Sequence, residues 1–272
     1  MSAAVVVSTL RVEPGKPAGL AGRDPGDRLS LADKESGLAR LEEQVARLGF
    51  LHNRLWAEQR RSVLLLLQGL DASGKDSTIR HVLTGVSPQG CRIVSFKEPT
   101  PAELQHDYLW RVHAVCPSRG ELGVFNRYHY EDVVAAQVRG LVPAHVLKKR
   151  PHHIREFERM LTDEGTTLVK AFLNVSRDEQ RARLQERLDN PEKAWKFRLG
   201  DLEDRARWSE YMVAYEDVIS ETSTDWAPWY VVPADHNWVR NLAIAELLVS
   251  TLERLDPQLP EPDPALLDLR IS

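Results

Sequence analysis

The sequence predicts an α/β fold with a parallel sheet. Strand-like apolar runs alternate along the chain with segments of helical periodicity, which is typical of parallel strands joined by helices. The run at Ser62–Gln68 (Ser-Val-Leu-Leu-Leu-Leu-Gln) is almost continuously apolar, as a strand buried on both faces requires. With 42% hydrophobic residues among 272, the chain can bury a sizeable core, which excludes a disordered protein.

The predicted elements alternate as follows. Strands are expected at 62–68, 91–96, 122–126, 166–175 and 229–232. Helices are expected at about 31–59, 77–84, 101–115, 131–140, 145–161, 177–188 and 238–255. In the first helix, Leu38, Leu41 and Val45 recur at three- and four-residue steps. Ser176 and Glu179 form a capping box, which marks the start of the helix after the fourth strand.

Changes in composition divide the chain. Residues 1–30 are rich in proline, glycine and alanine, and we expect them to form an extended N-terminal arm. Residues 31–256 are expected to form a single domain, followed by a proline-rich tail at 257–272. Within the domain, two charged helical pieces at 189–222 occupy the place of one crossover, which predicts a helical insertion.

Charge and cysteine content exclude several classes of protein. Lys and Arg number 36 against 40 Asp and Glu, a net charge of -4, so the chain is no general polyanion binder and no nucleic acid partner is expected. Cys91 and Cys116 have neither a disulfide-framework nor a zinc spacing. The longest apolar run is far shorter than the roughly 20 residues of a transmembrane helix. We therefore expect a cytoplasmic protein without a membrane partner.

Residues 69–76 read Gly-Leu-Asp-Ala-Ser-Gly-Lys-Asp and directly follow the most apolar strand. The spacing Gly-x-x-x-x-Gly-Lys, between a strand and a helix, is that of a phosphate-binding loop. Its backbone N–H groups and the helix N-terminus favour bound anions, and Lys75 is expected to reach the outer phosphates. Gly74, Asp76 and Ser77 flank this lysine. A glycine turn with a surface lysine is the alternative.

Two carboxylates distinguish this loop from the common version. Asp76 stands where Ser or Thr usually supplies a hydroxyl to Mg²⁺, and Asp71 lies within the loop itself. A carboxylate beside phosphates is repelled unless a cation lies between them, so we expect Mg²⁺ bridged by acidic groups. Alternatively, Asp71 orients an accepting phosphate oxygen or caps the turn.

A second segment, 123–132, reads Gly-Val-Phe-Asn-Arg-Tyr-His-Tyr-Glu-Asp. It begins as a strand and ends in Asn126 and Arg127, at the sheet edge where ligands of open α/β sheets bind. The guanidinium of Arg127 suits phosphate oxygens. Glu131 and Asp132 open the next helix, a position that acidic residues also favour for the helix dipole alone.

The insertion at 189–222 carries a third set of candidates. Its cations are suited to a lid that closes over phosphates, although a solvated charged surface is the alternative. The candidates are Lys193, Lys196, Arg205 and Arg207. We expect Trp195 and Trp208 to be packing residues rather than base-stacking ones.

Together the three segments resemble the family-2 polyphosphate kinases. Members of that family have a loop like Gly-x-Asp-Ala-x-Gly-Lys, a strand ending Phe-Asn/Asp-Arg, and a lid with Trp-Lys-Phe and Arg-Ala-Arg-Trp. This chain has the corresponding residues at 69–76, 125–127, 195–197 and 205–208. The similarity spans about 38–255. Tyr128 departs from the pattern, because family members often have serine there.

The resemblance implies a thymidylate-kinase-like P-loop kinase fold, a three-layer α/β/α sandwich with a parallel sheet and a helical lid. It implies reversible, Mg²⁺-dependent transfer of the terminal phosphoryl group of inorganic polyphosphate to a nucleoside mono- or diphosphate. Asn126 with Glu131 and Asp132 looks like the branch that accepts both mono- and diphosphates. A homo-oligomer, dimer or tetramer, is expected.

Each candidate receives a role under this interpretation. The catalytic residues are expected to be Asp71, Lys75, Arg127 and Asp132. Polyphosphate is expected to contact Gly74, Lys75, Asp76, Ser77, Arg127, Lys193, Lys196, Arg205 and Arg207. The nucleotide is expected to contact Asp71, Asn126, Glu131 and Asp132, and the metal to be held by Asp71 and Asp132.

Two other functions remain open at this stage. An ATP-dependent nucleoside monophosphate kinase shares loop, lid and sheet, but it predicts Ser or Thr after Lys75, where this chain has Asp76. A noncatalytic P-loop regulator that binds nucleotide is the other alternative.

Overall fold

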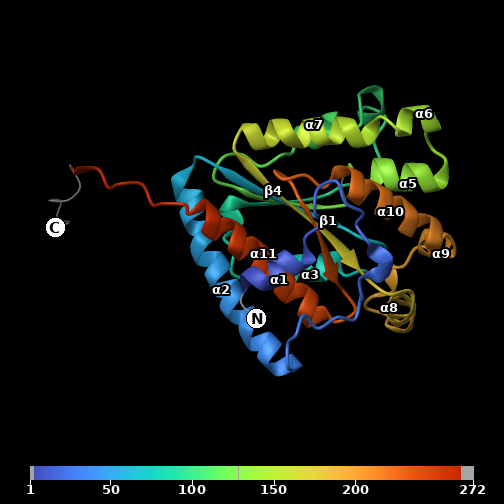
Figure 1. Ribbon diagram of the computed structural model, residues 1–272, viewed down its shortest axis with the longest axis horizontal. Helices are drawn as coiled ribbons and strands as arrows, with labels where there is room; N and C mark the ends of the chain where they lie inside the picture. The colour runs from blue at the N-terminus through green and yellow to red at the C-terminus, as the bar shows by residue number, and fades with distance from the viewer. Residues whose placement is uncertain (1–2, 128, 265–272) are drawn as a thin grey trace.

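The computed structural model describes residues 3–127 and 129–264, so Tyr128 lies outside the described residues, as do the ends of the predicted arm and tail. Its sheet is parallel, with strand order β2-β3-β1-β4-β5 (Figure 1). The strands are β1 (Ser62–Gln68), β2 (Cys91–Ser95), β3 (Leu122–Asn126), β4 (Thr166–Asn174) and β5 (Trp229–Pro233). The predicted parallel α/β sheet is thereby confirmed.

Helices cover both faces of the sheet. They are α1 (Ala3–Leu10), α2 (Lys34–Glu58), α3 (Lys75–Val82), α4 (Trp110–His113), α5 (Glu131–Arg139), α6 (Ala144–Leu147), α7 (Arg150–Asp163), α8 (Arg177–Asp189), α9 (Leu199–Ala206), α10 (Trp208–Thr222) and α11 (Asn237–Leu255).

The alternation of side chains along β1 builds two cores. Val63, Leu65 and Leu67 pack on the face covered by α2, α3 and α11. Leu64 and Leu66 pack on the face covered by α5, α7 and α10. A strand with both faces buried needs apolar residues throughout, which explains its continuous run. The three-layer α/β/α arrangement is confirmed (Figure 1).

The N-terminal arm is not simply extended. Residues 3–10 form α1, and Val7 and Leu10 pack into the core beside α11. Val12 and Leu20 are buried in the opposite core. The proline and glycine content suggested an extended arm, but apolar residues between the turns give the segment a surface that the domain buries.

Two other predicted helices are interrupted. Residues 101–115 form only a 3₁₀ turn (Glu103–Gln105) and the four-residue α4, because the Asp107 side chain accepts a hydrogen bond from the Leu109 N–H at 2.9 Å and turns the backbone. Residues 145–161 divide into α6 and α7. Pro151 lies in the first turn of α7, where its missing N–H costs no helical hydrogen bond.

The insertion contains helices, as predicted, but half of it belongs to the core. Tyr215 and Ile219 of α10 are buried against the sheet, whereas α9 and the 3₁₀ turn Ala194–Lys196 are more exposed. Trp208 packs against both cores. Trp195 is 77% exposed, so its predicted packing role is wrong.

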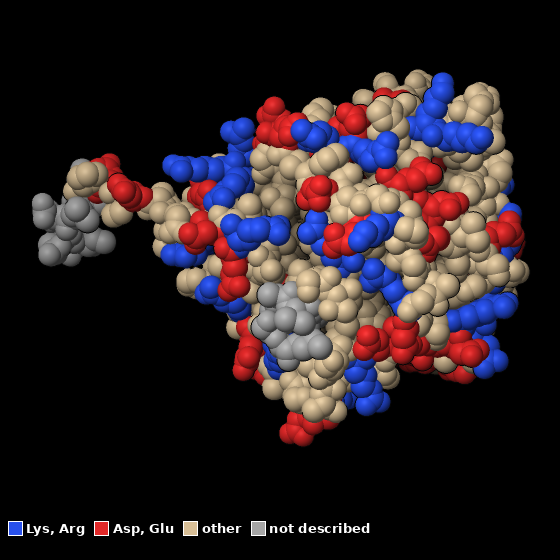
Figure 2. Space-filling model, viewed as in Figure 1, with Lys and Arg blue, Asp and Glu red and all other residues tan. Residues whose placement is uncertain are grey.

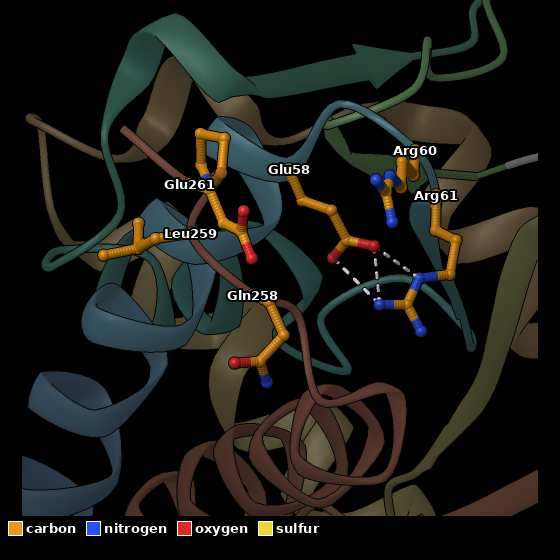
Figure 3. Close-up of a pocket in the computed structure, with 7 residues that line it drawn as sticks. Glu58, Arg60, Arg61, Gln258, Leu259 and Glu261 are labelled. Atoms are coloured by element: carbon orange, nitrogen blue, oxygen red, sulfur yellow. Dashed lines mark hydrogen bonds and ion pairs between the residues drawn. The ribbon is translucent and has the colours of Figure 1, made fainter. Parts of the chain in front are cut away.

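The tail leaves the domain at the amino end of the sheet. A cleft of about 460 Å³ lies there, between the end of α2 and tail residues such as Gln258 (Figure 3). Arg61 bonds Glu58 at 2.7 Å and donates to the Leu255 carbonyl at 2.5 Å. Because the phosphate-binding loop follows the carboxyl end of β1, this cleft is separate from it.

A buried ion pair joins four elements around one core. The Lys170 ammonium of β4 donates to the Glu158 carboxylate of α7 at 2.6 Å and to the Thr222 carbonyl of α10 at 2.7 Å. The Tyr130 hydroxyl, directly before α5, donates to Glu158 at 2.8 Å. All three side chains are buried, so each compensates the loss of water around the others.

Breaking this pair from one side should destabilise the fold strongly. We expect Glu158→Ala to lower the free energy of unfolding by about 3–5 kcal/mol, because Lys170 would keep a buried, uncompensated charge. Urea denaturation measures the loss. The double variant Glu158→Leu with Lys170→Met should lose clearly less, and a single-variant loss below about 1 kcal/mol would contradict the assignment.

Candidate active site

The phosphate-binding loop joins β1 to α3 with a backbone that needs glycine. Gly69 and Gly74 have φ of +146° and +102°, and even Ala72 has φ of +62°. A Cβ at Gly74 would lie 1.9 Å from Nη1 of Arg240, a fully buried side chain of α11. Both the conformation and the close contact therefore require glycine at position 74.

Lys75 is the first residue of α3 and is buried. Its ammonium donates to the carbonyls of Gly69 at 2.5 Å and Leu70 at 3.2 Å. Burial, helped by the nearby Arg127 charge, lowers the pKa of Lys75 to about 8, and carboxylates including Asp71 oppose the shift. A buried ammonium at a helix N-terminus is an attractive partner for a phosphate group.

The end of β3 meets this loop. The backbone of Arg127 has φ of +58°. Its guanidinium bonds the Asp71 carboxylate. The Asn126 amide donates to Asp76 at 2.5 Å. Glu131, at the start of α5, is close enough for its charge to act on Lys75, and burial raises the pKa of its carboxyl group. The structure thus brings together six predicted residues: Asp71, Lys75, Asp76, Asn126, Arg127 and Glu131.

Asp132 has different neighbours. Its carboxylate pairs with Arg111 at 3.4 Å, and its backbone carbonyl accepts a hydrogen bond from Arg150. Burial raises the pKa of Asp132, and the two arginines oppose that shift. Asp71 and Asp132 share no ionic partner among the residues that the structure describes, so the geometry gives no support to a metal held by both.

The carboxylates of this site suit a metal ion that is coordinated mainly by the phosphates of a bound substrate. The described ranges contain no cluster of three or more His, Cys, Asp or Glu side chains able to form a protein cage. Mg²⁺ commonly binds through one or two carboxylates together with substrate phosphates and water. Asp71, which projects from the phosphate-binding loop, fits that role.

The predicted cations of the insertion contact residues of the insertion and of α8, including Gln180, which accepts a hydrogen bond from Arg205 at 2.9 Å. Lys193 bonds Glu186 at 2.5 Å, and Arg207 bonds Glu210 at 2.5 Å. Arg205 donates to the Arg177 carbonyl at 2.7 Å. Lys196 lies 5.1 Å from the centre of the Trp195 ring. Ser77 on α3 is half-buried. Within the described residues, these contacts of the four cations of the insertion do not include Lys75.

Asp201 is one residue of the insertion that lies close to the loop, and sequence reasoning missed it. Its side chain is buried and close enough to feel the charges of Asp71 and Arg127, and burial raises its pKa. Arg187 lies 3.5 Å away. The residues next to Asp201 in the sequence are a mixture of acids and bases, so no pattern distinguished Asp201 from them.

Sequence reasoning also missed Arg183, Gln180 and Arg240, whose side chains donate hydrogen bonds to backbone carbonyls of the loop. Arg183 of α8 donates to the Ala72 carbonyl at 3.1 Å and to the Ala234 carbonyl at 2.7 Å. Gln180, one turn earlier, donates to the Asp71 carbonyl at 3.0 Å. Burial, with the nearby Arg183, lowers the pKa of Arg240 to about 9. These contacts link distant parts of the chain, so no local pattern indicates them.

The surface charge agrees with a local anion site. Lys and Arg are interspersed with Asp and Glu over the face seen in Figure 2, without a large region of one sign. The net charge is -4. Attraction of a polyanion must therefore depend on a few placed cations and on backbone N–H groups.

The model of the family "Polyphosphate kinase 2" matches residues 31–260, which include the loop, the end of β3 and the whole insertion. The chain belongs to the polyphosphate kinase 2 family. The predicted family resemblance is thereby confirmed.

Similar proteins include two polyphosphate phosphotransferases. The chain is 55% identical over 256 residues to an AMP/ADP-polyphosphate phosphotransferase of Meiothermus ruber, covering 94% of this chain and 96% of that protein. It is 45% identical over 237 residues to an ADP-polyphosphate phosphotransferase of Rhodopseudomonas palustris, covering 83% and 82%. A crystal structure of polyphosphate kinase 2 from Arthrobacter aurescens TC1 matches with a TM-score of 0.92 and 42% identity, covering 97% of this chain and 93% of that one.

Replacement of Gly74 tests the packing of this polyphosphate kinase 2 loop. Gly74→Ala combines a left-handed backbone with the contact to Arg240, whereas Gly140→Ala meets only the backbone penalty, since φ is +66° with no atom within 4 Å. We expect Gly140→Ala to cost about 1–2 kcal/mol of stability and Gly74→Ala about 1–3 kcal/mol more. Chemical denaturation of both variants measures the difference, and equal losses would contradict the close contact.

Proposed function

We propose that this protein transfers the terminal phosphoryl group of inorganic polyphosphate to nucleoside mono- and diphosphates, reversibly and with Mg²⁺. The observation that carries the proposal is the buried Lys75 at the start of α3, beside the Asp71–Arg127 pair and Glu131. Membership of the polyphosphate kinase 2 family and the names of the M. ruber and R. palustris relatives support the substrates.

Lys75 and the phosphate-binding loop bind the outer phosphates in this proposal. The ammonium now bonds the carbonyls of Gly69 and Leu70, which are neutral acceptors. An anionic phosphate oxygen is a stronger partner, because charge-assisted hydrogen bonds are roughly twice as strong as neutral ones. Phosphate binding therefore keeps Lys75 protonated although burial lowers its pKa.

Arg127 neutralises charge on the transferring group. Its pairing with Asp71 aims the guanidinium at the loop before substrate binds. Phosphoryl transfer needs positioning and electrostatic stabilisation more than covalent chemistry, so an oriented cation is an effective contribution. Asn126 and Glu131, on the same edge of the sheet, contact the nucleotide in this proposal.

Mg²⁺ supplies charge neutralisation between phosphate oxygens when it is bound. Asp71 would hold it, together with the phosphates. Asp132 is a weaker candidate, since it lies outside the phosphate-binding loop, at the start of α5, and its carboxylate pairs with Arg111 of α4.

The exposed half of the insertion acts as a lid over polyphosphate. Lys193 bonds Glu186, Arg207 bonds Glu210, and Lys196 lies 5.1 Å from the centre of the Trp195 ring, and a polyanion can replace these contacts. A homo-oligomer and a cytoplasmic location remain predictions from the sequence. The described residues include no helix that is both long and apolar enough to cross a membrane.

One assay tests the function. Purified protein is incubated with AMP or ADP, polyphosphate and Mg²⁺, and nucleotides are separated by chromatography. We expect ADP from AMP and ATP from ADP. Phosphorylation of AMP by ATP but not by polyphosphate would instead establish a monophosphate kinase. Binding without turnover would establish a regulator.

Lys75→Ala should reduce the transfer rate by about 10²-fold or more, the scale of losing one preorganised donor in a dry site. Lys34→Ala, which removes an exposed lysine at the start of α2, serves as the matched control. Initial rates at saturating substrates measure the effect. Turnover of Lys75→Ala within threefold of the parent, on the order of the control, would refute the role.

The pKa of Lys75 predicts how polyphosphate binding varies with pH. The ammonium is charged below about pH 8 and loses its proton above it, so binding should weaken as pH rises through this value. Lys75→Arg keeps its charge over this range and should bind with a flatter profile. Calorimetric titration with polyphosphate between about pH 7 and pH 9 measures both, and identical profiles would contradict the prediction.

Asp71→Asn separates two roles of the loop carboxylate. If Asp71 holds Mg²⁺, the amide should nearly abolish activity, and raising Mg²⁺ should restore part of the rate by mass action. If Asp71 only orients the accepting phosphate, no Mg²⁺ concentration should restore it. Near-parent activity at low Mg²⁺ would exclude both roles. Circular dichroism confirms that the variant is folded.

A further inference from the structure

Residues 12–30, here called the strap, lie before the part of the chain that the family model covers, 31–260. They nevertheless follow a fixed path across the domain (Figure 1, the blue segment between α1 and α2). The strap begins beside β5, where the Val12 N–H donates to the Trp229 carbonyl at 2.8 Å. It then reaches the carboxyl ends of β4 and β5, where the Asp235 N–H donates to the Pro25 carbonyl at 3.1 Å.

The strap is bound to α10 through one carboxylate. The two oxygens of Glu216 accept hydrogen bonds from the consecutive N–H groups of Gly19 at 2.8 Å and Leu20 at 2.7 Å. The Ser220 hydroxyl, one turn later, accepts from the Ala18 N–H at 2.8 Å. Gly19 has φ of +68°, which helps to present both N–H groups to the carboxylate. Charge-assisted bonds of this kind are stronger than neutral ones.

The same turn of α10 lies close to the catalytic cluster. Tyr215, adjacent to Glu216, is fully buried. Burial raises the pKa of Tyr215, with a further contribution from the Glu131 charge, and the nearby Arg127 opposes the shift. A displacement of this turn would therefore be felt by the side chains that surround the phosphate-binding loop.

The other end of the strap is linked to the loop itself. The Asn174 side chain of β4 donates to the Arg23 carbonyl at 3.0 Å. Arg183 donates to the Asp235 carbonyl at 2.9 Å and, with its other nitrogen, to the Ser73 carbonyl at 3.3 Å. Asp235 thus contacts both the strap and the arginine that holds the loop. The strap therefore connects α10 with the phosphate-binding loop through Asp235 and Arg183.

We propose that the strap anchors the base of the lid, and that Glu216 is the positioning residue that fixes α10 relative to the phosphate-binding loop. The exposed part of the insertion, 190–206, then moves on a rigid base, and its cations meet polyphosphate at a defined distance. The inference rests on the proposed function and deepens it, since it assigns residues outside the family model to polyphosphate affinity.

Steady-state kinetics of Glu216→Ala and a matched control test this role. Asp217→Ala removes a neighbouring carboxylate on the exposed side of α10. We expect Glu216→Ala to raise the KM for polyphosphate at least about fivefold, the lower end of typical couplings between sites, with a much smaller change in the KM for nucleotide. Glu216→Gln keeps one acceptor oxygen and should recover part of the affinity. Asp217→Ala should match the parent.

Limited trypsin digestion provides a readout that does not need activity. Lys193, Lys196 and Arg198 are cleavage points within the exposed part of the lid, and cleavage of a folded protein follows the population of the open form. We expect faster cleavage there in Glu216→Ala than in Asp217→Ala at a temperature where both are folded.

The two experiments distinguish a failure of the proposed function from a failure of the proposal about the strap. If the parent shows no polyphosphate-dependent turnover, the proposed function fails, while the cleavage comparison still tests the strap. If Glu216→Ala lowers only the melting temperature, and its cleavage and KM values match those of Asp217→Ala, Glu216 is merely structural and the proposal is overturned.

Discussion

The burial of one ammonium group, that of Lys75, is the constraint around which the rest of the site is built. A cation removed from water needs compensation, and the neighbours of Lys75 provide it with two carbonyls and with the carboxylates of Asp71 and Glu131. Arg127 balances the surplus of negative charge by pairing with Asp71. The positive and negative charges of the cluster are thus nearly balanced. An incoming phosphate replaces contacts that these side chains already make.

Residues far from the ammonium keep this arrangement in place. Arg183 and Arg240 donate to the Ala72 and Ser73 carbonyls and so fix the backbone of the loop. On the opposite face, the Lys170–Glu158 pair holds Tyr130 immediately before Glu131. Both sides of the site therefore depend on buried charge, which is costly to break and favours a single geometry.

The sheet and the loop could be predicted because their patterns are local. The boundaries of β1 and β3 follow from apolar runs, and the loop follows from two glycines and a lysine at fixed spacing. The partners of Asp132 could not be predicted, since Arg111 lies 21 positions away on a four-residue helix. Residues 3–10 were misjudged because their burial depends on α11, which is formed more than 200 residues later.

The position of the tail has a practical consequence for handling the protein. After α11 the chain leaves beside Glu58 and Arg61, at the amino end of the sheet (Figure 3). Lys75 and Arg127 follow the carboxyl ends of β1 and β3. A fusion partner or a solid support attached through the C-terminal tail would therefore stand on the side opposite the phosphate-binding loop. Immobilised in this orientation, the enzyme would keep the phosphate-binding loop on the side that faces the solution.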